Sequence, residues 1–141
     1  MKHLAQFVHI NDYFDRDHLK HLPRLPVGWL NDRRVLFLFD EPEAVFRSVR
    51  RRQFLHKHAG ELGSVACQFT WGGLQQKLFE RAVKQQVESF HSHNSENLML
   101  LSFDDIWARA EDIAEFFAIE DDRFLNEFPP RRPRKSEQFQ V

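Results

Sequence analysis

The chain has 141 residues, enough for about one domain, and its 42% hydrophobic and 29% charged residues are an ordinary balance for a globular protein. A net charge of −1 gives the whole chain no strong field, so neither nucleic acid nor an acidic membrane is expected as a partner. The single cysteine, Cys67, excludes an internal disulfide framework, and without a secretory signal or a long apolar run a cytoplasmic location is expected.

Three short apolar runs are typical of buried strands. The clearest is residues 35–39, Val-Leu-Phe-Leu-Phe, where five apolar residues without alternation predict a strand covered on both faces. Residues 98–101 form a second run that ends near Phe103. Residues 6–10 form the third and weakest.

Helical patterns lie between and after these runs. Pro42 can open a helix that continues to about Lys57. Apolar residues spaced three and four apart predict a second helix over residues 74–90 and a third over residues 105–117. A capping box of Ser102 with Asp105, or Asp104 alone, would start the third helix. The apolar stripe of the second helix consists of Leu74, Leu78, Ala82, Val83, Val87 and Phe90.

The remaining segments have the composition of loops. Residues 60–73 hold four of the five glycines and predict a loop around Trp71, whereas residues 17–29 predict irregular structure with a short helix. The ending after Phe128 has no periodicity. Residues 1–128 are therefore expected to form a single α/β domain, and residues 129–141 a basic arm rich in proline and arginine.

Alternation of strands and helices predicts an α/β fold, a small parallel sheet flanked by helices. Three strands make a small sheet, because doubly wound domains usually have more. Either a strand is missing at the front, or the chain completes its sheet by pairing with another copy, which would make it a homo-oligomer.

Four segments, in order, resemble the P-loop sulfotransferase family. Residues 20–23, Lys-His-Leu-Pro, resemble the family's Lys-Thr-His-Leu-Pro region, and residues 35–49 are similar to its strand, turn and helix for the 3′-phosphate of the sulfate donor. Residues 100–106 look like the strand followed by Tyr-Glu-Asp-Leu, and residues 113–119 match the helix ending with Phe-Leu-Gly. The resemblance implies a truncated sulfotransferase-like domain.

The resemblance also implies site residues. His21 would be the catalytic base with Lys20 nearby, Ser48 would contact the donor, and Arg47 and Arg51 would supply positive charge to it. The cofactor would be 3′-phosphoadenosine 5′-phosphosulfate, and the acceptor a hydroxyl of a small molecule or a glycan.

Two departures from the family bear on activity. The sequence contains no G-x-x-x-x-G-K-[ST] or comparable loop for the donor's phosphosulfate. Asp40 stands where the family places an arginine, and a carboxylate repels a phosphate. The expectation is therefore a degenerate or incomplete sulfotransferase, whose loop would come from upstream sequence or a partner if it is active.

Alternatives stay open at several positions. The arginines can form the solvated face of a helix, His21 can be a surface residue, and the fold can serve as a non-catalytic module for protein binding or oligomerisation. The His56/His58 and His91/His93 pairs are two residues apart, which on a helix directs them to different faces. His18 and His21 are three residues apart and could share a helix face, but the sequence has neither HExxH nor a cysteine cluster, so no metal site is expected.

Overall fold

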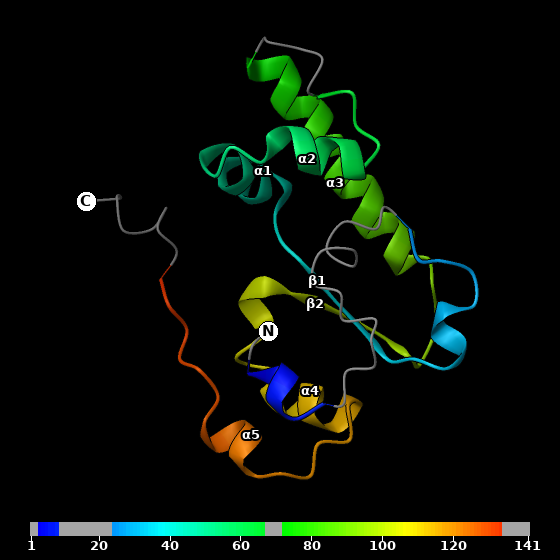
Figure 1. The fold of residues 1–141 in the computed structure, drawn as a ribbon, viewed down its shortest axis with the longest axis vertical. Coiled ribbons are helices and arrows are strands. Elements are labelled where there is room, and N and C mark those ends of the chain that lie inside the picture. The colour runs from blue at the N-terminus through cyan, green and yellow to red at the C-terminus, as the bar shows by residue number, and fades with distance from the viewer. Residues whose placement is uncertain (1–2, 9–23, 67–71, 134–141) are drawn as a thin grey trace. The chain divides into compact units, whose positions relative to one another are not determined.

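A computed structural model describes residues 3–8, 24–66 and 72–133 of the chain. It divides into two compact units (Figure 1). One comprises residues 11–103, and the other combines residues 1–10 with residues 104–141.

The sheet of the first unit consists of two parallel strands. Strand β1 (Val35–Phe39) pairs with β2 (Leu98–Ser102) in a register that joins the first residues of the two strands and also their last. Both segments are strands, as predicted, but every residue of β1 is half-buried, so the prediction that β1 is covered on both faces is not confirmed. The fold is thus mixed α/β, with a two-stranded parallel sheet in the part of the chain that the structure describes.

Three helices connect the two strands along the chain, as a parallel pair requires. They are α1 (Pro42–Arg51), α2 (Leu55–Glu61) and α3 (Gly72–His91). Helix α3 confirms the helix predicted over residues 74–90. It begins two residues earlier, so Gly72 and Gly73 belong to its first turn and not to the predicted loop.

The core of this unit lies where the three helices meet. Phe79 of α3 is fully buried, and its ring centroid lies 5.7 Å from that of Phe46 on α1. The core cluster consists of Phe46, Val49, Ala59, Ala66, Phe79 and Val83. Further along α3, Phe90 stacks on Phe37 of β1 with ring centroids 3.9 Å apart, which fixes the helix against the sheet.

The single helix predicted from Pro42 to Lys57 is wrong, because the chain turns between α1 and α2. Gln53 adopts a left-handed backbone conformation with φ 60°. The N–H of Gln53 donates to the Arg50 carbonyl and that of Phe54 to the Val49 carbonyl, which together form a Schellman motif. The turn brings Val49 of α1 and Ala59 of α2 into the same core, so burial of both helices stabilises the break.

The described part of the second unit contains two short α-helices, α4 (Ala110–Phe116) and α5 (Arg123–Asn126). The helix predicted over residues 105–117 begins five residues late and ends one residue early. Its predicted caps are also wrong, because Arg109 is the N-cap residue and no side chain caps the helix. Asp104 instead forms an ion pair with Arg131 at 2.9 Å.

Aromatic rings join the beginning and the end of the chain within this second unit. His3 stacks on Phe124 with ring centroids 5.2 Å apart, and His3 Nε2 donates to the Phe124 carbonyl at 2.7 Å. Phe7 and Phe128 each meet Phe124 edge to face. Phe124 is only 1% exposed, so this aromatic cluster forms the centre of the unit.

The strand predicted over residues 6–10 is wrong for residues 6–8, and residues 9 and 10 lie outside the described residues. The structure has a 3-10 helix, Leu4–Gln6, followed by a turn at Phe7. Packing of the Phe7 ring against His3 and Phe124 decides this conformation over the β-propensity of the segment.

The start of the predicted C-terminal arm contacts the second unit. Trp107 Nε1 donates to the Pro129 carbonyl at 2.8 Å, and Arg131 forms the ion pair with Asp104 described above. Residues 129–133 contain no helix or strand, and residues 134–141 lie outside the described residues. The division of the chain at residue 128 stays a prediction.

Candidate functional site

Asp40 connects the carboxyl end of β1 to α1. The backbone N–H of Glu41 donates to Asp40 Oδ1 at 2.8 Å, and Pro42 starts the helix at its first turn, where its fixed φ is favourable. Because the strands are parallel, Phe103, which follows β2, lies at the same edge of the sheet as Asp40. In open α/β sheets ligands bind at this edge.

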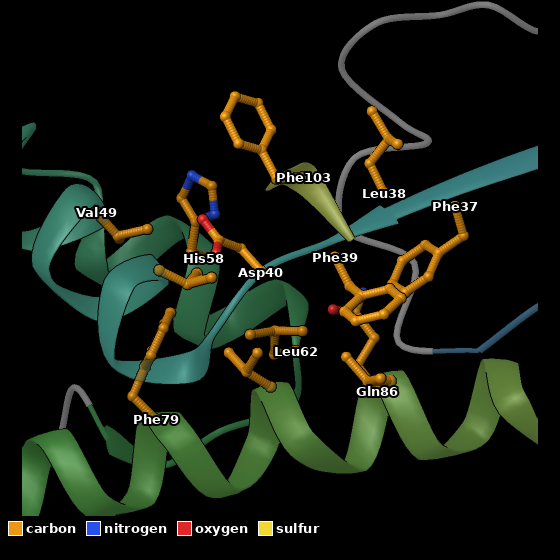
Figure 2. Close-up of a pocket in the computed structure, with 13 residues that line it drawn as sticks. Phe37, Leu38, Phe39, Asp40, Val49, His58, Leu62, Phe79, Gln86 and Phe103 are labelled. Carbon is orange, nitrogen blue, oxygen red and sulfur yellow. The ribbon is translucent and has the colours of Figure 1, made fainter. Parts of the chain in front are cut away.

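A pocket of about 210 Å³ lies at this edge (Figure 2). Its wall is mainly apolar and combines β1, α1, α2 and α3, with Phe39, Val49 and Phe79 among its residues. Sites for drug-sized ligands begin at about 300 Å³, so this pocket fits one ring system or a short aliphatic group.

Three polar side chains interrupt the apolar wall: Asp40, His58 of α2 and Gln86 of α3. In Figure 2 the Asp40 carboxylate and the His58 imidazole are directed toward the same side of the pocket. A carboxylate and an imidazole at one end of an apolar pocket can accept hydrogen bonds from an amine or hydroxyl of a ligand. A phosphate would meet repulsion from Asp40.

The described nucleotide-contact candidates do not line this pocket. Ser48 is half-buried on α1. Arg47 is exposed, and its guanidinium forms an ion pair with Glu43 at 3.2 Å. Arg51 is exposed at the last position of α1. All three residues share one helix, but only Ser48 is even partly buried.

The two catalytic candidates, Lys20 and His21, lie outside the described residues, so their catalytic roles stay predictions. Trp71 of the predicted loop also lies outside the described residues. Asp40, which the sequence singled out as a departure from the family, does occupy the carboxyl edge of the sheet and lines the pocket there.

Sequence reasoning missed the pocket roles of His58 and Gln86. His58 was considered only as one of a pair with His56, and the structure places the two differently on α2, with His56 exposed and His58 half-buried. The break at Gln53 sets the direction of α2 and hence of His58. Gln86 lies on α3 between Val83 and Val87, and all three line the pocket. Its position beside two residues of the predicted apolar stripe was the signal that could have identified it.

Within residues 3–8, 24–66 and 72–133, no three His, Cys, Asp or Glu side chains are placed to hold a metal ion together. Over the same residues, no helix has both the length and the apolar character needed to cross a bilayer.

Comparisons with known proteins identify no relative. No protein-family model matches the chain, and no curated protein or solved structure matches it either. The function must therefore be argued from the residues and the geometry alone.

Proposed function

We propose that the chain is a sulfotransferase-like protein that binds the adenosine 3′,5′-bisphosphate part of 3′-phosphoadenosine 5′-phosphosulfate beside Ser48. Without a phosphosulfate loop in its sequence, the chain alone lacks the groups that would hold the transferring sulfuryl group. It would therefore bind the nucleotide without catalysing transfer, unless upstream sequence or a partner supplies the loop.

The parallel, in-register pairing of β1 with β2 carries this proposal. The resemblance aligns β1 and α1 with the family's strand and helix for the 3′-phosphate, and β2 with its strand before Tyr-Glu-Asp-Leu. Parallel pairing puts the carboxyl ends of both strands at one edge, as a shared nucleotide site requires.

The end of α4 gives further support. The resemblance aligns the family's Phe-Leu-Gly ending with Phe116, Phe117 and Ala118. Ala118 has φ 52°, a left-handed conformation for which glycine is the preferred residue. The residue that the resemblance aligns with the family's glycine therefore has a backbone conformation that glycine adopts most easily.

Titration calorimetry of the purified chain with adenosine 3′,5′-bisphosphate tests the proposal. We expect micromolar binding that weakens about tenfold or more in Ser48→Ala, because a hydrogen bond to a charged group contributes about 1.5–3 kcal/mol. Ser89→Ala is the matched control, since Ser89 is a half-buried helical serine whose hydroxyl donates to the Gln86 carbonyl of its own helix.

A second candidate, a non-catalytic binding module on the same fold, is favoured by the pocket itself. Its wall is apolar, its polar end carries Asp40, and it includes none of Arg47, Ser48 and Arg51. Absence of any heat or thermal shift at millimolar bisphosphate would refute the nucleotide proposal and leave this second candidate.

A further inference from the structure

The turn between α1 and α2 concentrates positive charge that the whole chain does not have. Residues 44–60 contain five Lys and Arg and no Asp or Glu, although the net charge of the chain is −1. We call one part of this segment the basic turn; it consists of Arg50, Arg51, Arg52, Phe54 and Lys57.

The four cations of the basic turn are exposed and form no ion pair with another described residue. Arg47, one turn earlier on α1, differs because it is paired with Glu43. The negative end of the α1 dipole explains cations in the last turn, where Arg50 and Arg51 lie. Arg52, the C-cap residue of α1, shares this effect, but Lys57 does not, because it lies in the first turn of α2, where a helix dipole disfavours a cation.

An aromatic ring stands among these cations. The Phe54 side chain is 52% exposed, one of the most exposed large apolar side chains in the described part of the chain. Gln53, immediately before it, holds its left-handed φ without being glycine, which costs conformational free energy. Such strain tends to occur at functional sites, and here it accompanies a turn in which an exposed aromatic ring follows three arginines by two residues.

We propose that the basic turn is a contact surface for an anionic lipid bilayer. The Phe54 ring would enter the interfacial region while the arginines and Lys57 contact lipid phosphates, the combination by which surface-binding segments hold to membranes. Charges farther from the bilayer than about 8 Å are screened at physiological salt, so the turn can act although the rest of the chain is net acidic.

The small number of aromatic rings in the basic turn favours a membrane over single-stranded nucleic acid as its partner. Proteins that bind single strands follow the backbone along a charged groove and stack successive bases on several aromatic rings. The basic turn offers one exposed ring and four exposed cations within residues 50–57, which is too few rings to stack successive bases. This inference is independent of the nucleotide proposal.

Co-sedimentation of the full chain with phospholipid vesicles tests the inference. We expect binding to vesicles that contain phosphatidylglycerol, weakening as salt rises, and none to vesicles of phosphatidylcholine alone. Each cation removed should lower the partition coefficient about fivefold, so Arg52→Gln with Lys57→Gln should lower it by about 25-fold. Phe54→Ser should also weaken binding.

Matched controls lie on α3. Arg81→Gln with Lys84→Gln removes two exposed cations, and Leu74→Ser removes an apolar side chain that is 39% exposed. If these controls lower vesicle binding as much as the turn variants do, or if the chain does not bind anionic vesicles, the proposal is wrong. Binding of a labelled single-stranded oligonucleotide, lost in the turn variants while vesicles stay unbound, would assign the turn to nucleic acid instead.

Discussion

Three helices of the described residues end in a Schellman motif, which has one residue in the left-handed conformation. In only one of the three is that residue a glycine. Gln53 after α1, Gly63 after α2 and Ala118 after α4 have φ values of 60°, 67° and 52°. In each motif the next residue donates its N–H to a carbonyl five residues earlier, which closes the Schellman turn. A side chain at this position costs about 1 kcal/mol relative to glycine.

Exchanging these residues should therefore change stability in opposite directions. We expect Gln53→Gly and Ala118→Gly each to raise the free energy of unfolding by up to about 1 kcal/mol, and Gly63→Ala to lower it by a similar amount. A Cβ at Gly63 would have no atom within 4 Å, so that loss would come from the backbone alone. Urea denaturation measures all three, and destabilisation by Gln53→Gly would show that the glutamine side chain has a role of its own.

At the start of α5, an ion pair changes the acidity of one residue. The Arg123 guanidinium donates to the Asp121 carboxylate at 2.6 Å, and this hydrogen bond, with one from the Arg123 backbone N–H, holds the pKa of Asp121 below its usual range. A carboxyl group with a lowered folded-state pKa contributes stability above its unfolded-state pKa and loses it as the pH falls through the folded-state value.

The variant Asp121→Asn should thus melt at a slightly lower temperature than the unmodified protein at neutral pH. The difference should disappear in acid, below the lowered pKa, because Asp121 is then protonated in both states. Melting curves from neutral to strongly acidic pH measure this. A difference independent of pH would attribute the effect to packing instead of charge.

Among the elements, α3 was the most predictable because its apolar residues repeat over five turns. The apolar pattern still predicted the wrong burial at single positions. Leu74 belongs to the predicted stripe but is 39% exposed, whereas Phe79, outside the predicted stripe, is fully buried. Neighbouring helices decide which flank of an amphipathic helix is covered, and a single sequence does not contain that information.

The contrast between these two residues is measurable. We expect Phe79→Ala to lower the free energy of unfolding by about 3–5 kcal/mol, because it opens a cavity between α1 and α3. Leu74→Ala should change it by no more than about 0.5 kcal/mol, because Leu74 lies at the surface with 39% of its area already exposed. Similar losses in both variants would contradict the burial described for α3.

The ends of the other helices were not predictable from local signals. No glycine or proline marks the break at Gln53, and the acidic residues before α4 resemble caps without serving as such. One of the three polar side chains of the pocket depends on that break, since the break directs His58 of α2 to the pocket. Asp40, by contrast, was predictable as an edge residue because it directly follows a strand.

At the scale of the whole molecule, the alternation of strands and helices correctly predicted a parallel α/β arrangement. The sheet has two strands in the described residues, not three. Phe7, predicted to lie in the third strand, packs its ring against Phe124 in the aromatic cluster instead. Such a pairing joins residues more than a hundred positions apart, and no local pattern in the first ten residues reveals it. The likeness to sulfotransferases stays a hypothesis for the calorimetric test.

The aromatic cluster also constrains the order of events during synthesis on the ribosome. His3 and Phe7 are translated more than a hundred residues before Phe124 and Phe128. All of residues 11–103 are translated in between, and domains generally fold as units while the chain grows. The segment with His3 and Phe7 must therefore remain without its aromatic partners, with its rings in water or on a chaperone, until Phe124 and Phe128 have been translated.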